Sequence, residues 1–203
     1  MVVTALKQSS PGRFVVEFDG GETLRSTLDA VTDARLYVGM ELDTEAFEEL
    51  KRSSSKALDR QKALEMLSRR PYSRRELRDK LLRSGTDEQS AEDCVSWLCE
   101  RGFLDDEEYA GAVARHYAAK GYGAGKVKSE LRRRGIEREL SDETLAALPV
   151  DTDKIDAFIA RRLRDPSDRD SVRKIGAALF RRGWSWEEIR AALRRFDTET
   201  EED

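Results

Sequence analysis

Histidine, cysteine and long apolar runs are scarce in this sequence, and each scarcity excludes a class of function. His116 is the only histidine among 203 residues, so neither a Ser-His-Asp nor a Cys-His catalytic set can form without it. It lies in a helical pattern, where a packed or partly exposed helix residue is the simpler interpretation. The two cysteines, Cys94 and Cys99, form no CxxC motif and no disulfide framework, which favours packing roles in a reducing compartment.

No segment resembles a membrane span or a leader. Runs of about 18 apolar residues are absent, and residues 1–20 lack a charged stretch followed by an apolar one. The chain shows no cluster with the spacing of metal ligands and no acidic pair suited to acid–base catalysis. We therefore expect a cytoplasmic protein that is not an enzyme, holds no cofactor or metal and does not enter a membrane.

Charge is abundant but unevenly distributed. Charged residues make up 38% of the chain, and the formal net charge is −4. Residues 1–54 carry a net −4 and residues 197–203 hold five acids and no base, whereas residues 60–83, 115–138 and 161–195 each carry a net +6. A nearly neutral total thus conceals three basic segments, and the location of charge matters more to binding than the sum.

A repeat explains the three basic segments. The stretch SRRELRDKLLRSG aligns with GAGKVKSELRRRG at an offset of 50 residues, which in turn aligns with SVRKIGAALFRRG at an offset of 48. Two apolar residues four apart recur in each copy, followed four residues later by a glycine suited to a helix C-terminus. These positions are Leu77, Leu81 and Gly85, then Val127, Leu131 and Gly135, then Ile175, Leu179 and Gly183. Each unit is predicted to form three short helices, giving roughly nine.

Helix start signals support the repeat. A capping box, in which a serine and a glutamate three residues later satisfy each other's backbone N–H groups, is typical of a helix N-terminus. The signals are Ser73-x-x-Glu76, Ser185-x-x-Glu188, the related pair Asp105-x-x-Glu108, and Ser171 at the repeat position of Ser73. They place helix starts on either side of the glycines.

The N-terminal region differs from the rest. Arg13–Phe18 (RFVVEF) is predicted to be a strand, and the turn signal Asp19-Gly20-Gly21 leads into a returning strand over Glu22–Leu28. A second short apolar run, RLYVGMEL, follows. From Thr44 the pattern becomes helical, with a serine cluster at Ser53–Ser55 that we expect to loosen or break the helix.

These observations predict a mainly α protein with a small N-terminal β-containing module and three tandem three-helix repeats in an elongated array. The predicted divisions are residues 1–43 for the module, 44–106 for a helical linker and repeat 1, 107–150 for repeat 2, 151–196 for repeat 3, and 197–203 for an acidic tail.

The glycine-rich segment KGYGAGKVKSELRRRGI, residues 120–136, superficially resembles a phosphate-binding loop. A Walker loop would need a glycine at Lys120 and a hydroxyl at Val127, and a dinucleotide fingerprint would need a glycine at Lys126. The segment fails all three requirements, and no parallel-strand unit precedes it. The repeat alignment instead makes it the turn before the second helix of repeat 2.

Basic residues recur at matching positions in the three repeats, and two interpretations stay open. They form either a solvated helix face with local ion pairs or a positive stripe for a polyanion or an acidic protein polymer. The candidates are Arg75, Arg78, Arg83, Lys126, Lys128, Arg132, Arg133, Arg134, Arg173, Lys174, Arg181 and Arg182. Tyr72 and Tyr122 share one turn position between basic residues and are weaker candidates for stacking on bases. Trp97, Trp184 and Trp186 are interpreted as core residues.

Several separated stretches resemble the bacterial RecX proteins, which regulate the RecA recombinase. The resemblance covers about residues 36–196. The sequence departs from the family pattern at Ala124, a turn position where proline is expected. The matching stretches are RRPYSRRELRDKLLRSG (69–85), RGFLDDEEYA (101–110), KGYGAGKVKSELRRRGI (120–136) and LFRRGWSWEEIRAAL (179–193).

The resemblance implies a protein that binds along the filament of RecA on single-stranded DNA, and we expect it to be a monomer. It implies inhibition of ATP hydrolysis and strand exchange, in DNA repair, recombination and the SOS response, without enzymatic activity of its own. Single-stranded DNA is a further candidate partner. Two alternatives remain: a nucleic-acid-binding helical module that acts alone, and a helical scaffold for another protein. The scaffold interpretation predicts that charge reversal at Arg83, Arg133 and Arg181 leaves filament binding intact.

Overall fold

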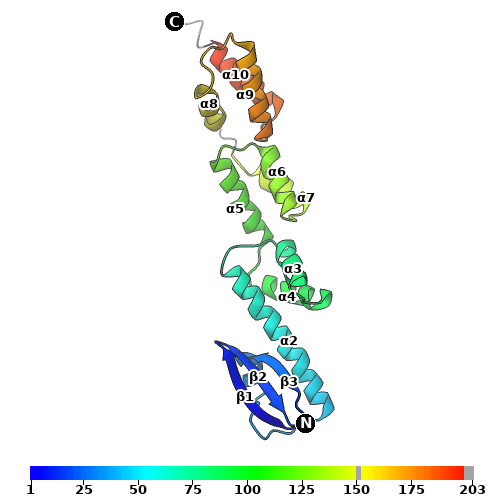
Figure 1. Cartoon of the computed structure of the whole chain (residues 1–203). Coiled ribbons are helices and arrows are strands. Elements are labelled where there is room, and N and C mark those ends of the chain that lie inside the picture. Colours follow the sequence, from blue (N-terminus) through cyan, green and yellow to red (C-terminus); the bar gives the residue numbers. More distant parts are fainter. Residues whose placement is uncertain (150–151, 199–203) are drawn as a thin grey trace. The chain divides into compact units, whose positions relative to one another are not determined.

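The structure, a computed structural model, describes residues 1–149 and 152–198 (Figure 1). These residues form ten helices and one three-stranded sheet, so the prediction of a mainly α protein with a small β-containing module is confirmed. The acidic residues 199–203 and the boundary residues 150–151 lie outside the described part. Within the described ranges, no helix combines the length and the apolar character needed to cross a membrane.

The N-terminal sheet is antiparallel, with the strand order β1-β2-β3. Strand β2 (Arg13–Phe18) and strand β3 (Thr23–Thr27) occupy the predicted segments, and Gly21 in the turn between them has a φ of 80°. Strand β1 (Val3–Ser10) was not predicted, because its polar and apolar residues do not form a marked strand pattern. It pairs with β2 from Val3 opposite Phe18 onward.

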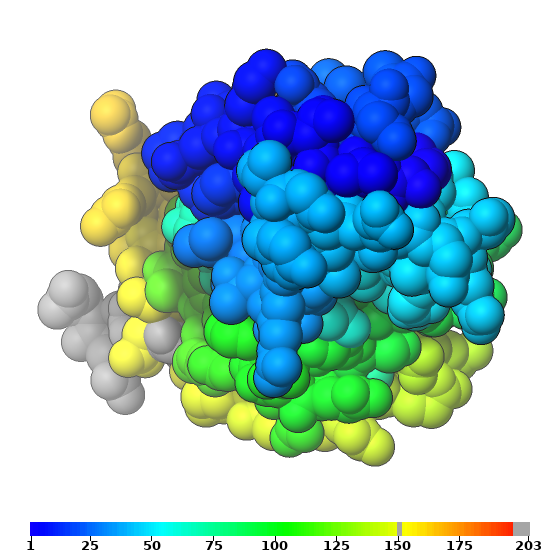
Figure 2. All heavy atoms as spheres, turned by 90° about the horizontal axis from the view of Figure 1, so that it is seen from below, coloured from blue at the N-terminus to red at the C-terminus, as the bar shows by residue number. Residues whose placement is uncertain are grey.

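The apolar run RLYVGMEL does not form a strand. Its residues follow helix α1 (Leu28–Asp33) as a loop, in which Glu41 makes a single bridge to Val2. Leu36 and Leu42 nevertheless point inward, joining Val3, Val16, Phe18, Val31 and Leu50 in the core of the module. Figure 2 shows the strands and the beginning of the next helix as one continuous surface.

Helix α2 (Thr44–Leu67) runs through the serine cluster without a break, so the expected interruption at Ser53–Ser55 is wrong. Ser54 is fully buried, and its hydroxyl lies 2.9 Å from that of Ser26, which is also buried. Ser53 donates a hydrogen bond to the carbonyl of Leu50 within the helix. The hydroxyls of Ser53 and Ser54 therefore both have partners that are compatible with a helical backbone.

The remaining helices come in the predicted threes, and each group surrounds its own apolar core. The two apolar positions that define the repeat are buried in every copy, with Leu81, Leu131 and Leu179 at 0% exposure. The first group consists of α2, α3 (Arg74–Arg83) and α4 (Glu88–Glu100). The second consists of α5 (Asp106–Ala119), α6 (Ala124–Arg133) and α7 (Arg138–Ala146). The third consists of α8 (Thr152–Ala160), α9 (Arg169–Arg181) and α10 (Trp186–Thr198).

The predicted helix ends are also found. Gly85, Gly135 and Gly183 follow the second helices with φ values of 92°, 77° and 90°, a conformation that favours glycine. Both capping boxes form, as in Ser185, whose hydroxyl accepts from the Glu188 N–H and whose own N–H donates to the Glu188 carboxylate. Asp105 caps α5 as expected.

Ser171 does not begin a helix, although it shares the repeat position of Ser73. Asp168 is the N-cap of α9 and accepts from the N–H groups of Asp170 and Ser171, so α9 starts one turn earlier than α3. Asp168 is a favourable N-cap residue and is followed by a helix-compatible sequence. The alignment with the other two repeats, whose second helices begin later, did not indicate this earlier start.

By packing, the described residues separate into two compact units. The first contains Met1–Tyr72 and Leu77–Leu104, and the second contains Ser73–Glu76 with the described residues from Asp105 onward. The finer division into module, repeats and tail stays a prediction.

Candidate functional site

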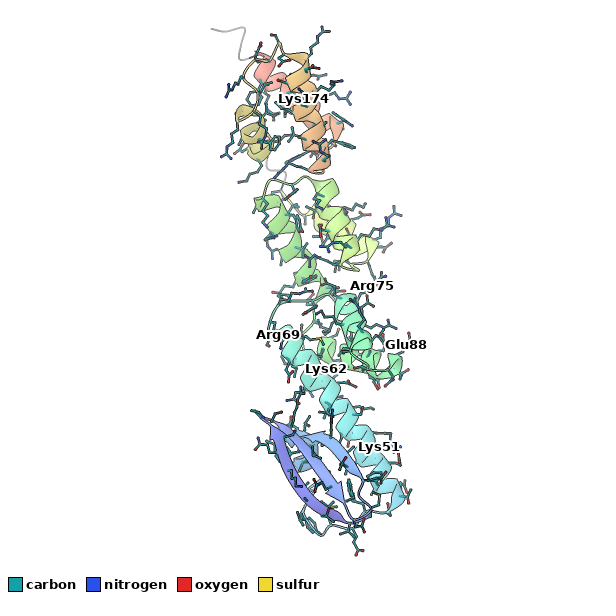
Figure 3. All side chains as sticks on the ribbon, in the orientation of Figure 1. Lys51, Lys62, Arg69, Arg75, Glu88 and Lys174 are labelled. Carbon is teal, nitrogen blue, oxygen red and sulfur yellow. The ribbon has the colours of Figure 1, made fainter. Side chains whose placement is uncertain are left out.

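The candidate cations lie on, or directly after, the second helix of each repeat: α3, α6 and α9. Arg75 on α3 and Lys174 on α9 are labelled in Figure 3. The candidate cations divide into two groups by burial, because a half-buried cation already makes contacts within the fold. The exposed members are Arg75, Arg83, Lys128, Arg132, Arg133, Arg173, Lys174 and Arg181, and the half-buried members are Arg78, Lys126, Arg134 and Arg182.

Two of these cations connect the second helix of a repeat to the third. Arg78 on α3 donates to Glu88 at 2.6 Å and to Glu92 at 2.8 Å, both on α4. Lys128 stands at the same position in α6 and pairs with Asp142 on α7, where its hydrogen bond lowers the pKa of the Asp142 carboxyl. Both residues therefore hold helices together within a repeat, in addition to any external contact.

Glu130 neutralises two further candidates. This side chain is buried on α6, where it accepts from Lys126 at 3.0 Å and from Arg133 at 2.6 Å. Burial alone would raise the pKa of Glu130, but the hydrogen bonds from Arg133 and Lys126 outweigh it and lower the pKa to about 2. The three charges form one cluster with a net charge of +1 at neutral pH.

Arg134 belongs to a polar network at the start of α3. Its guanidinium donates to the Tyr109 hydroxyl and lies 3.7 Å from the Glu76 carboxylate, to which Tyr109 donates at 2.7 Å. Its backbone carbonyl accepts from the Ser73 hydroxyl. Burial and the Glu76 carboxylate raise the pKa of Tyr109, so the phenol stays protonated and acts as a donor. Arg134 thus has a structural role.

Arg182, at the repeat position of Arg134, has a comparable role. It donates to the backbone carbonyls of Lys120 at 2.7 Å and Gly121 at 3.3 Å. Its guanidinium also lies 4.4 Å from the centre of the Tyr122 ring and 5.3 Å from that of Phe158. The segment before α6 is fixed by these contacts to the residues after α9.

The glycine-rich segment owes its composition to a close backbone approach. The Gly123 N–H donates to the Arg182 carbonyl at 3.0 Å, and the Gly125 N–H donates to the Gly183 carbonyl at 2.9 Å. A Cβ atom at Gly123 would lie 2.5 Å from the Gly183 oxygen. Because these N–H groups at the start of α6 already have carbonyl partners, they are not a phosphate site, as the sequence predicted.

Four exposed candidates have neither an ion pair nor a side-chain hydrogen bond among the residues that the structure describes. They occur in all three repeats, with Arg75 on α3, Arg132 on α6, and Lys174 and Arg181 on α9. A surface cation without a carboxylate partner loses no internal interaction when it meets an external anion. These side chains are therefore the strongest members of the candidate set.

The two stacking candidates differ from expectation. Tyr72 is 6% exposed in the core of repeat 1, and the Arg70 guanidinium lies 3.6 Å from its ring centre, so its ring is not presented to a base. Tyr122 is half-buried, with Arg182 over its ring and the Tyr117 ring centre 5.6 Å away at a 60° tilt. Packing within repeat 1 accounts for the Tyr72 ring, and packing against Tyr117 and against Arg182 of repeat 3 accounts for the Tyr122 ring.

Sequence reasoning missed two aromatic clusters at the surface. Trp97 is half-buried rather than a full core residue, with Arg60 and Arg101 over its ring and the exposed Phe103 stacked beside it. Trp186 is 48% exposed, so its assignment to the core is wrong, whereas Trp184 is buried as expected. Trp186 is the first residue of α10, and only part of its ring is covered there.

The described residues contain no group of three or more His, Cys, Asp or Glu side chains that could hold a metal ion. His116 is exposed near the end of α5, and its ring is nearly perpendicular to that of Tyr117. Burial raises the pKa of the Cys94 thiol to about 11, which makes it a packing group with little thiolate character.

Comparison with known proteins shows which family has this arrangement of helices. The family description "RecX, first three-helix domain" matches residues 60–98, and "RecX, second three-helix domain" matches residues 105–145. A regulatory protein RecX of Xanthomonas axonopodis pv. citri (strain 306) is 39% identical over 142 residues, which are 68% of this chain and 87% of the relative. One of Halorhodospira halophila (strain DSM 244 / SL1) is 34% identical over 149 residues, which are 70% of this chain and 90% of the relative.

Solved structures agree in fold. A crystal structure of a regulatory protein RecX superposes with a TM-score of 0.72 at 22% identity, over 93% of this chain and 97% of the other. That of RecX from Lactobacillus salivarius gives a TM-score of 0.64 at 22% identity, over 71% of this chain and 97% of the other. The sequence identities, the two matched domains and the three-helix repeats together establish that this chain belongs to the RecX family.

Proposed function

We propose that this protein regulates the RecA recombinase, mainly as an inhibitor, by binding along the RecA filament on single-stranded DNA. In this proposal it has no enzymatic activity, acts as a monomer in the cytoplasm, and modulates ATP hydrolysis and strand exchange during repair, recombination and the SOS response. Membership of the RecX family, whose relatives are named regulatory proteins, supports the proposal.

The observation that carries the proposal is the recurrence, on equivalent helices, of exposed cations that have no ion-pair partner among the described residues. Arg75, Arg132 and Arg181 each leave a guanidinium available on the second helix of a repeat. We propose that the three helices present one basic stripe to acidic recombinase surface or to phosphates of the bound strand. Because a filament repeats its binding surface, several weak contacts on one chain add up to a strong attachment.

The test is to titrate the protein into a reaction of RecA with single-stranded DNA while ATP turnover and strand exchange are followed. Both rates are expected to fall as the protein saturates the filament. A triple variant with Arg75→Glu, Arg132→Glu and Arg181→Glu should lose most of this effect, whereas Arg25→Glu on β3 should retain it. Unchanged turnover and exchange at saturation would refute the regulatory proposal.

The alternative, a nucleic-acid-binding module that acts alone, gives a different result in the same assays. It predicts tight, steeply salt-dependent binding to bare single strands, because each neutralised phosphate contributes to the salt dependence. Filament rates would then change only where the protein competes for free DNA. A rate effect that persists when every strand is already covered by RecA favours the filament.

A further inference from the structure

Phe180 and Trp186 form an exposed aromatic pair in repeat 3. Their ring centres are 5.2 Å apart and their planes are inclined by 16°, so the rings are stacked. Phe180 is 51% exposed and Trp186 is 48% exposed. Gly176, one turn before Phe180 on α9, leaves room for the indole, since a Cβ atom there would lie 3.3 Å from the Trp186 ring. A flat aromatic surface of this kind is unusual on a water-exposed helix pair.

The pair replaces an ion bridge that the other repeats use at the same place. Repeats 1 and 2 join their second and third helices there through a cation and a carboxylate, but repeat 3 has neither partner of that bridge. The equivalent positions hold Arg78 and Glu92 in repeat 1, Lys128 and Asp142 in repeat 2, and Gly176 and Arg190 in repeat 3. The aromatic stack now joins α9 to α10, and a carboxylate has become a cation.

Cations flank the aromatic pair along both helices. Arg169 and Arg173 precede Phe180 by eleven and seven residues on α9, a spacing that places all three on one helix face. Arg190 lies one turn after Trp186 on α10 and folds back to donate to the Trp186 carbonyl at 3.2 Å. All three arginines are exposed, and the pair that Arg173 makes with Asp170 is a surface contact of little strength.

We propose that Phe180 and Trp186, flanked by Arg173 and Arg190, bind an unpaired base of single-stranded nucleic acid. A flat exposed aromatic surface beside cations matches a chain of planar bases joined by phosphates, because the rings stack while the guanidiniums meet the phosphates. An acidic peptide would satisfy the charges but would leave the planar surface without a matching group. Repeat 3 therefore offers a stacking surface, whereas the equivalent place in repeats 1 and 2 is occupied by an internal ion bridge.

The experiment uses the full chain and a fluorescent oligothymidine of about 20 nucleotides, longer than a typical single-strand site. Phe180→Ala and Trp186→Ala are each expected to weaken binding about tenfold, with an unchanged slope of affinity against salt concentration. Arg173→Gln and Arg190→Gln should instead make that slope shallower by about 0.7 per lost phosphate contact. Trp186→Phe keeps an aromatic plane and should retain most of the affinity.

An abasic oligonucleotide of equal length separates stacking from charge. The alanine variants should bind it as the unmodified chain does, because it offers phosphates but no bases. Equal losses on both oligonucleotides, or no loss on either, would overturn the assignment. Normal oligothymidine binding combined with a loss of RecA-filament binding would also overturn it, and would assign the surface to a protein partner. No recombinase is present in the oligonucleotide assays, so they succeed or fail separately from the proposed regulatory function.

Discussion

At the scale of single residues, burial and charge have opposing effects on the pKa of Glu130. Its carboxylate is nearly covered, yet its pKa is lowered to about 2 because hydrogen bonds from Arg133 and Lys126 outweigh the burial that would raise it. A lowered pKa in the folded state stabilises the protein above the unfolded value near 4.5, and this contribution disappears as the pH falls toward 2.

Glu130→Gln is therefore expected to lower the free energy of unfolding at pH 7 by about 1–2 kcal/mol, since the three hydrogen bonds from Lys126 and Arg133 lose their charged acceptor. It should also flatten the dependence of stability on pH between about 4.5 and 2. Urea unfolding at pH 7 and at several acidic values measures both effects. The exposed Glu139→Gln is the control, and equal pH profiles for the two variants would contradict the prediction.

The sequence identified the candidate cations by position but could not assign their partners. Helical spacing is local, so it shows which residues share a face over a few turns. The carbonyls that receive the Arg182 side chain lie about 60 residues earlier, and the Tyr109 hydroxyl that accepts from Arg134 is 25 residues away. Contacts at such separations depend on tertiary packing, so Arg134 and Arg182 could not be distinguished from Arg132 and Arg181 by pattern.

At the scale of secondary-structure elements, the start of α6 is held by the residues that end α9. Gly123→Ala is expected to lower the free energy of unfolding by about 1–3 kcal/mol, because its Cβ atom would overlap the Gly183 backbone, 2.5 Å away. The hydrogen bonds from Gly123 and Gly125 would lengthen or break. Thermal unfolding and limited proteolysis of the second unit measure the loss.

Gly20→Ala provides the matched control for this glycine. Gly20 has open space around its Cβ position and no positive φ, so its replacement should leave stability nearly unchanged. If Gly123→Ala were equally neutral, the close approach to Gly183 would not explain why the segment is rich in glycine.

Helix boundaries were predictable where a local signal determines them. The capping boxes and the terminal glycines act through residues within one turn, and they were found where the sequence placed them. The serine cluster in α2 was misjudged because a hydroxyl's effect on a helix depends on its partner. Ser54 meets Ser26 from the sheet, and no local pattern reveals that contact. Strand β1 was missed for a similar reason, since pairing with β2 defines it.

At the scale of the whole molecule, the repeat was predictable because the same apolar and glycine pattern occurs in three copies along the sequence. Buried leucines recur at one register position with 0% exposure, and each repeat needs the same apolar face to form its core. The differences between the three copies were harder to predict from the sequence. Repeat 3 exchanges an ion bridge for an aromatic stack, and the exchange becomes visible only when the equivalent helix pairs are compared in three dimensions.

If the three repeats bind one filament together, their charges should contribute independently, and their contributions to the free energy of binding should add. Arg75→Gln, Arg132→Gln and Arg181→Gln are each expected to weaken binding to the RecA filament roughly two- to fivefold, the range of a single exposed ion pair. The triple variant should lose the product of the three factors, and all losses should shrink at high salt. Fluorescence anisotropy of labelled filaments at several salt concentrations measures them, with Arg25→Gln on β3 as the control for charge outside the repeats. A loss confined to one repeat would instead indicate a single local site, because independent contacts on equivalent helices must each contribute to a shared attachment.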